Sequence, residues 1–201
     1  MDMAFHGVTS DTAKHLQLDA GAFFKNFDPT QDTYASASAK LIGATAGGGS
    51  FAAIPTIRRI EVDGLKGATK GYEALDEWQV TLTANVKEIT VSSMELALAT
   101  GSHTSVKSPS SSTSNNYEKI VAANDIADSN YLTNVTWVGR LSGSQTPIII
   151  VVKNALATNG LTLTTADKSE GVIAITLTGH YAVSDLETPP FEIYYPILST
   201  T

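Results

Sequence analysis

The chain has 201 residues and no cysteine, which excludes a disulfide framework, a thiolate metal site and a cysteine nucleophile. Hydrophobic residues make up 42% of it and charged residues only 16%, against roughly 25% charged residues in ordinary soluble domains. The formal net charge of −7 argues against a protein that grips the phosphate backbone of nucleic acids. So few charges favour a surface that contacts other protein, and the length suits a single domain over residues 1–201.

The sequence indicates neither a membrane span nor a secretory signal. No stretch approaches the roughly 20 consecutive apolar residues that cross a bilayer as a helix. The first residues, MDMAFHGVTSD, lack the basic and apolar regions of a secretory signal peptide. We therefore expect no membrane partner and a protein that is made and folded in a cytoplasm.

Residues 1–50 predict an N-terminal arm that ends in a glycine-rich segment. Phe23 and Phe24 belong to an apolar cluster without a sustained helical period, as in an arm or an irregular strand. The sequence GATAGGGS follows at residues 43–50, and we expect a flexible or turn-forming segment there that lets subunits approach closely. Its three consecutive glycines are Gly47, Gly48 and Gly49.

Strand signals begin at residues 50–64, where Pro55 favours an edge position because proline has no amide hydrogen to donate. A glycine-rich turn at residues 63–71 then reverses the chain. The clearest strand covers residues 78–86, in which apolar and polar residues alternate. Its predicted core face is Trp78, Val80, Leu82, Ala84 and Val86, and its polar face includes Thr81, Thr83 and Asn85.

One short α-helix is predicted after this strand. Ser92 stands three residues before Glu95, which is the spacing of a capping box, and Gly101 follows the apolar residues as a glycine stop. Residues 102–116 have almost no apolar side chains and cannot offset the entropy cost of ordering. We therefore expect an exposed, mobile loop there, within a long loop insertion over residues 102–131.

Strand signals return in the C-terminal part of the chain, at residues 134–141, 146–153 and 172–183. The segment TPPFEIYYP at residues 188–196 reads as an aromatic strand flanked by prolines, which belongs at a sheet edge. It carries Tyr194 and Tyr195. The pattern as a whole predicts a mainly β fold with one short flanking α-helix, long loops and an N-terminal arm.

No motif predicts catalysis or a cofactor. The glycines of residues 43–50 have the spacing of a phosphate-binding loop, but Gly49 occupies the position of the lysine that contacts the β- and γ-phosphates. The histidines are far apart in sequence, although the fold could still bring His15 and His180 together with a carboxylate. The acidic residues are spread singly, and a pair would act on a glycosidic bond only at a separation of about 5 to 10 Å. We therefore predict no catalytic residue, no cofactor and no metal site.

Four segments follow one another in a characteristic order: AGAFFKNFDP at residues 20–29, IGATAGGGSF at 42–51, IRRIEVDGLKGATKGYEALDEW at 57–78 and TPPFEIYYP at 188–196. In that order and spacing they resemble the major tail tube proteins of long-tailed, siphovirus-type bacteriophages and prophages of Gram-positive bacteria. The resemblance covers most of the chain and is loosest in its serine-rich stretch and at residues 124–141. None of the four segments is a catalytic signature.

This resemblance implies a β-sandwich or barrel-like core with a flanking helix, in a subunit that forms hexameric rings stacked into a hollow tube. The implied partners are copies of the chain itself and other tail proteins, such as the tape measure, terminator and distal tail proteins. Genomic DNA would pass through the tube without specific binding, because wall charges of the same sign keep it from sticking. The implied location is the virion tail, assembled in the cytoplasm of the host bacterium.

Candidate site residues follow from this kind of assembly. The polar face of the clearest strand, Thr81, Thr83 and Asn85, is a candidate lumen surface. Two other classes stay open: a decoration or pilus-like structural subunit with the same core, and a carbohydrate-binding module or enzyme. Electron microscopy separates them, because the tail tube hypothesis alone predicts rings or tubes. The candidate assembly contacts are Phe23, Phe24, Gly47, Gly48, Gly49, Tyr194 and Tyr195.

Overall fold

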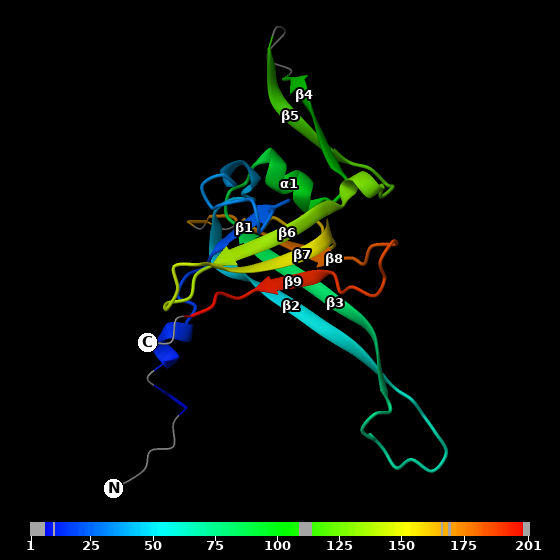
Figure 1. Ribbon diagram of the computed structural model, residues 1–201. Coiled ribbons are helices and arrows are strands. Elements are labelled where there is room, and N and C mark those ends of the chain that lie inside the picture. Colours follow the sequence, from blue (N-terminus) through cyan, green and yellow to red (C-terminus); the bar gives the residue numbers. More distant parts are fainter. Residues whose placement is uncertain (1–6, 10, 109–113, 166, 169, 199–201) are drawn as a thin grey trace.

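Antiparallel β-strands are the main secondary structure of the protein in a computed structural model, which describes residues 7–9, 11–108, 114–165, 167–168 and 170–198 (Figure 1). The described residues contain one α-helix, so the predicted mainly β fold with one short helix is confirmed. Short 3-10 turns occur at Thr12–His15, Ser38–Lys40 and Asp128–Asn130. The other elements are β1 (Ala22–Lys25), β2 (Thr45–Arg59), β3 (Glu73–Val86), α1 (Val91–Ala97), β4 (Gly101–Lys107), β5 (Asn115–Ala122), β6 (Leu132–Gly139), β7 (Ile148–Ala157), β8 (Ile173–Gly179) and β9 (Phe191–Tyr194).

Strand β7 joins the two layers of one folded-over sheet. The strand order in this seven-stranded sheet is β1-β6-β7-β8-β3-β2, and β9 pairs with β7. The first part of β7 pairs with β6 and β9, whereas its last residues, Leu156 and Ala157, pair with β8. The layer that contains β1, β6 and β9 is therefore continuous with the layer that contains β2, β3 and β8. Strand β2 ends the order, so the edge position that Pro55 predicts is confirmed.

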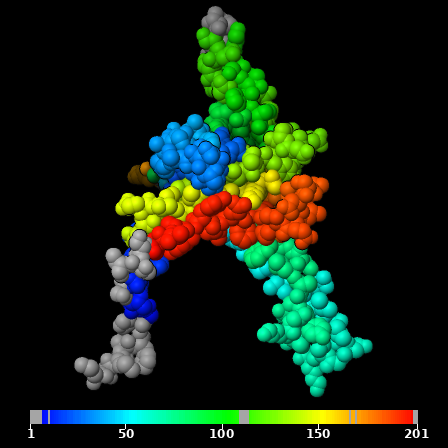
Figure 2. Space-filling model, viewed as in Figure 1, coloured from blue at the N-terminus to red at the C-terminus, as the bar shows by residue number. Residues whose placement is uncertain are grey.

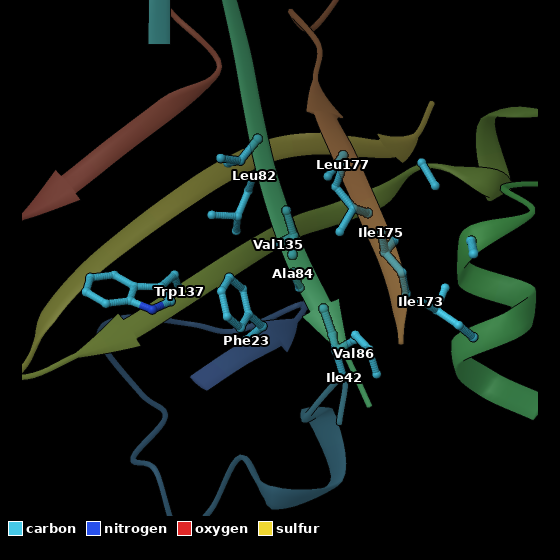
Figure 3. Packing of buried hydrophobic residues seen from close by; sticks show 14 of the residues in the cluster. Phe23, Ile42, Leu82, Ala84, Val86, Val135, Trp137, Ile173, Ile175 and Leu177 are labelled. Atoms are coloured by element: carbon cyan, nitrogen blue, oxygen red, sulfur yellow. The ribbon is translucent and has the colours of Figure 1, made fainter. Parts of the chain in front are cut away.

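The main core lies between these two layers (Figure 3). The alternation predicted for residues 78–86 is confirmed, because one face is buried and Trp78 is half-buried against the same cluster. Full burial of a large apolar side chain contributes about 1.5–3 kcal/mol to folding. The core includes Val80, Leu82, Ala84 and Val86 of β3, Ile173, Ile175 and Leu177 of β8, Phe23 of β1, Val135 and Trp137 of β6, and Val152 of β7.

A second apolar cluster lies on the opposite face of β1, β6 and β7. The segment between β1 and β2, residues 26–44, covers this cluster with Phe27 and Ala37, and we call it the covering segment. Asn134 holds it in place, because its Oδ1 accepts a hydrogen bond from the amide of Phe27 and its Nδ2 donates to the carbonyl of Phe27, both at 2.9 Å. From β1 onwards the predicted N-terminal arm is therefore part of the folded body, which corrects the expectation for residues 1–50. The buried members of this cluster are Phe24, Phe27, Ala37, Val138, Ile149 and Val151.

Helix α1 begins with a capping box that involves other residues than predicted. Thr90 is the N-cap: its Oγ1 accepts a hydrogen bond from the amide of Ser93 at 3.1 Å. Ser93 Oγ in turn accepts one from the amide of Thr90 at 2.9 Å. The box therefore stands two residues before the predicted pair of Ser92 and Glu95, with serine in the place of glutamate.

The segment after α1 also corrects the sequence-based expectation. Ala99 turns the chain with a φ of 60°, whereas the predicted glycine stop, Gly101, is the first residue of β4. The described part of residues 102–116 is not a mobile loop, because β4 and β5 pair as an antiparallel two-stranded sheet. Backbone hydrogen bonds across the hairpin supply the order that its polar composition does not predict. The rest of that prediction, residues 109–113, lies outside the described residues.

The glycine-rich segment is likewise a strand, since β2 begins at Thr45. Its pairing with β3 is interrupted between Thr45 and Gly49. Gly47 and Gly48 fall in this irregularity with φ values of 73° and 68°, a left-handed conformation that glycine adopts without strain. A bulge of this kind bends a strand, so these glycines shape the start of β2 rather than form a free loop.

Candidate functional site

The outer part of the β2–β3 hairpin, residues 54–77, projects far from the body of the subunit (Figures 1 and 2). Ile57 and Leu75 are cross-strand partners on it and are 57% and 53% exposed. Arg58 Nε lies 3.1 Å from Asp76 Oδ2 and forms an exposed ion pair nearby. Apolar side chains gathered on an uncovered projection are typical of a surface that another protein covers. The other exposed large apolar residues of this hairpin and its turn are Ile54, Ile60, Val62, Leu65 and Tyr72.

The β4–β5 hairpin projects on the side opposite to the β2–β3 hairpin (Figure 1). Its base is joined by Thr100, whose hydroxyl donates to the carbonyl of Ala123 at 2.8 Å. Glu95 of α1 lies 2.7 Å from Nδ1 of His103, and this carboxylate raises the pKa of the imidazole. Tyr117 is exposed on the outer part of the hairpin. The second projection is therefore anchored to the helix by the contact between His103 and Glu95, and it also presents an aromatic side chain to solvent.

Phe23 and Phe24, two of the predicted assembly contacts, lie inside the subunit. Each is only 1% exposed, Phe23 in the main core and Phe24 in the second cluster. Gly49 permits this arrangement, because a Cβ atom there would lie 2.0 Å from the carbonyl oxygen of Thr83 and 2.6 Å from the ring of Phe23. The two phenylalanines therefore stabilise the folded subunit and present no surface to a neighbour.

The predicted glycine positions border a small pocket of about 260 Å³. Its apolar wall includes Phe51 and Trp137, and none of its described lining residues is charged. A pocket of this kind can hold an apolar side chain, and its polar lining side chains are those of Gln17 and Ser50. The three glycines are Gly47, Gly48 and Gly49, of which Gly48 is buried and the other two are exposed.

Tyr194 and Tyr195 are exposed at the end of β9, where a neighbouring subunit could contact them. The predicted edge position is confirmed, because β9 pairs with β7 alone among the described strands. Tyr194 Oη donates to Glu192 at 2.7 Å, and this hydrogen bond raises the pKa of the phenol. The same carboxylate forms an ion pair with Lys153. That the two tyrosines contact another subunit stays a prediction.

Thr81, Thr83 and Asn85 lie half-buried on the outer face of β3, as the alternation predicts. The hydroxyl groups of Thr83 and Thr176 are 3.0 Å apart and hydrogen bonded. The register places Thr178 opposite Thr81, which extends the row of threonines onto β8. Thr81, Thr83 and Asn85 of β3 and Thr176 and Thr178 of β8 therefore form a stretch of uncharged polar side chains, which we call the threonine face. Its position at a lumen stays a prediction.

The described residues contain no group of three or more histidine and acidic side chains that could hold a metal ion. His15 and His180 have separate partners: Nδ1 of His15 hydrogen bonds to the carbonyl of Asp11, and Nδ1 of His180 hydrogen bonds to the carbonyl of Asn154, both at 3.0 Å. In the same part of the chain, every buried polar side-chain atom has a hydrogen-bond partner.

Within the described ranges, no helix is long and apolar enough to cross a membrane. No family model matches the sequence. A search of curated proteins also finds no match to it. The surfaces described above, the two hairpins, the β9 edge and the threonine face, are therefore the features from which a function can be inferred.

Proposed function

We propose that this chain is a structural subunit that assembles with copies of itself into hexameric rings, which stack into the tail tube of a long-tailed bacteriophage. The observation that carries this proposal is the β2–β3 hairpin, which extends beyond the core with Ile57 and Leu75 uncovered. In a single subunit these apolar side chains stay exposed to water and add nothing to its stability, whereas in a polymer a neighbouring subunit would cover them. The four ordered segments that resemble tail tube proteins point to the same class.

The energetic argument concerns the apolar surface of this hairpin. Covering apolar area contributes about 25 cal/mol per Å², so covering a few half-exposed aliphatic side chains contributes several kcal/mol per contact. A tube repeats each contact many times. The low charged content of the chain, 16%, supports the same proposal because it limits the cost of desolvating the surfaces that come together.

The threonine face suits the wall of a DNA conduit. Thr81, Thr83 and Asn85 are polar but uncharged, and they lie beside Thr176 and Thr178 of β8. These side chains carry no positive charge that would hold phosphates, and the net charge of −7 repels DNA. We propose that this face lines the lumen and that the genome passes along it without specific binding.

In this proposal the first partner is a second copy of the chain. The further partners are other proteins of the tail, such as the tape measure, terminator and distal tail proteins. The mature location is the virion tail, after assembly in the host cytoplasm. Catalysis and cofactors have no part in it. The polar contacts of Thr100 and Glu95 with the β4–β5 hairpin would hold that hairpin in place at a contact between subunits.

Purified protein tests the proposal directly. Sedimentation velocity at rising concentration should show a transition from monomer to large species, and negative-stain electron microscopy should show rings or tubes. Monomer alone at every concentration, with no rings or tubes in the micrographs, contradicts the proposal. Isolated particles that bind saccharides would favour a carbohydrate-binding module instead.

A further inference from the structure

A groove of about 760 Å³ lies at one end of the body, between the segment that precedes β1, the covering segment and the turn from β6 to β7. Its floor is apolar and includes the largely buried side chains of Phe27, Val138 and Ile149. Arg140 and Tyr34 also line it, and both are exposed. We call this surface the β6–β7 groove. It combines an apolar floor with a cation at its rim.

Arg140 forms no ion pair with any carboxylate of the described residues. Two carboxylates line the same groove. Asp32 is already paired with Lys40, and the hydrogen bonds it accepts from the amide of Asp28 and from Lys40 lower its pKa. Asp19 forms no ion pair either. The guanidinium at the rim is thus free to pair with a carboxylate from another molecule.

The loop of residues 182–188 lies at the opposite end of the body, where Figure 2 shows it in orange, away from the yellow β6–β7 turn. Val183 is 96% exposed and Leu186 is 65% exposed. Asp185 holds the loop in shape, because its Oδ1 accepts hydrogen bonds from the amides of Glu187 and Thr188, each at 3.2 Å. The loop is therefore an ordered projection that presents aliphatic side chains to solvent.

Glu187 adds a free charge to this loop. Its carboxylate forms no ion pair in the described part of the chain, in contrast to Asp185, which is engaged in the turn. Leu186 and Glu187 are adjacent, so the loop presents an apolar side chain beside a carboxylate. This is the complement of an apolar floor beside Arg140.

We propose that the 182–188 loop of one copy docks in the β6–β7 groove of the next copy, with Leu186 on the apolar floor and Glu187 paired with Arg140. The inference rests on the proposed function and names the lateral contact within a ring. The two surfaces lie at opposite ends of one subunit, so the contact is head to tail and repeats from copy to copy until a ring closes. The two hairpins leave the body in other directions, which keeps them available for contacts between rings (Figure 1).

Charge reversal tests the pairing. Arg140→Glu and Glu187→Arg each place like charges opposite one another, so either variant should raise the concentration needed for ring formation by about tenfold or more. The double variant restores the opposite charges in exchanged positions and should assemble at a concentration close to that of the wild type. Both residues are exposed, so the variants should keep the thermal stability of the wild-type monomer. Lys119→Glu on β5 is the matched control: it lies outside the lateral contact, so it should form rings at the same concentration as the wild type, whatever its effect on the stacking of rings.

Disulfide trapping gives a second measurement. Because the chain has no native cysteine, only the introduced cysteines can form a disulfide. Cysteines at Thr146 in the groove and Glu187 in the loop are at opposite ends of one subunit. Mild oxidation of the T146C/E187C variant should therefore link separate copies into a ladder on a non-reducing gel. The pair K119C/E187C should give no ladder.

The outcomes separate this contact from the proposed function. Wild-type rings together with unaffected charge-reversal variants and no ladder overturn the lateral contact and leave the tube proposal standing. A wild-type protein that stays monomeric at every concentration overturns both. Single reversals that fail to assemble, with no recovery in the double variant and no ladder, also overturn the docking of this loop.

Discussion

Ala99 adopts a backbone conformation that glycine usually occupies. Its φ of 60° lies in the left-handed region, where the methyl group of an alanine crowds the backbone at a cost of about 1 kcal/mol. The residue still packs partly against the main core, so removing the methyl group also loses some contact. The strain is the larger of the two effects, since the side chain is a single methyl group that is only partly buried.

We therefore expect Ala99→Gly to raise the free energy of unfolding by about 0.5 kcal/mol. Ala97→Gly is the control two residues earlier, inside the last turn of α1 and fully buried. It should lower the free energy of unfolding by about 1 kcal/mol or more, because glycine is a poor helix former and the core loses a methyl group. Urea denaturation measures both. Equal destabilisation by the two variants would mean that Ala99 is not strained.

Gly49→Ala should destabilise the subunit by about 1–3 kcal/mol or more. A Cβ atom at this position would lie 2.0 Å from a backbone carbonyl oxygen of β3, and neither strand can shift without breaking the pairing. Gly7→Ala is the control, because nothing lies within 4 Å of its added Cβ atom. Thermal unfolding of the two variants at low protein concentration measures the difference. A Gly49→Ala midpoint as high as that of Gly7→Ala would show that the strands are not so close.

At the residue scale, the sequence predicts the features that depend on neighbouring residues along the chain. The alternation of residues 78–86 gave the buried face of β3 correctly, since every second side chain of a strand shares a face. The roles of Phe23 and Phe24 were missed, because their burial depends on strand β6, more than a hundred residues later in the chain. The hydrophobic periodicity around Phe23 and Phe24 does not indicate which distant strand covers them.

Among the elements, the two hairpins differ in how they are held. The β2–β3 hairpin continues two strands of the main sheet, whereas β4 and β5 form a separate sheet that contacts the body mainly through α1. The carboxylate of Glu95 accepts a hydrogen bond from His103 and raises the pKa of that imidazole, with a smaller contribution from the nearby Glu118. The attachment of the second hairpin therefore depends on pH.

The direction of this pH dependence follows from the raised pKa of His103. The charged imidazole stabilises the folded state fully below its unfolded pKa of 6.5, and the contribution is lost as the pH rises through the higher folded value. Glu95→Gln should thus lower the thermal stability at about pH 5.5 more than at about pH 9, where the imidazole is neutral in both states. It should also return the pKa of His103 toward its usual value in an NMR titration. Glu118→Gln should give a smaller shift, and an unchanged His103 pKa in Glu95→Gln would contradict the contact.

Most strands were predictable because they carry their own signals, such as β-branched runs, turn glycines and flanking prolines. The β4–β5 hairpin was not, because its order comes from backbone pairing and from contacts with α1 rather than from apolar side chains. Ile57 lies in the strand predicted at residues 50–64 and Leu75 lies between the predicted turn and the next predicted strand, but neither was predicted as part of a projecting surface. The sequence indicates that two strands flank a turn. It does not indicate how far these strands extend beyond the residues that pack against them.

At the scale of the whole molecule, the prediction concerns Ile57 and Leu75, the exposed apolar pair on the projecting β2–β3 hairpin. The double variant Ile57→Ser and Leu75→Ser should change the stability of the monomer by less than about 1 kcal/mol, since an exposed cross-strand pair contributes only that much. It should raise the concentration needed for tube formation by about tenfold or more, because the buried apolar area is lost at every contact.

Lys66→Ser with Lys70→Ser is the matched control on the turn of the same hairpin and should affect tube formation much less. Light scattering against concentration measures assembly, and circular dichroism measures folding. Normal tubes from the apolar variant would remove this hairpin from the contact. The resemblance to tail tube proteins predicted assembly surfaces on loops and arms, but which side chains the body leaves uncovered follows only from the folded sheet.

The pairing of the sheet also sets the order in which the chain can fold. Strand β1 pairs with β6, and β3 pairs with β8, so both layers unite the first half of the chain with the second. While the ribosome is still making β6, the described residues already synthesised can close the two hairpins but neither face of the core. Contacts so distant in sequence form slowly. The nascent chain can therefore close its projecting β2–β3 hairpin before the core that carries this hairpin has formed, and the two layers come together only after β6, β7 and β8 have been synthesised.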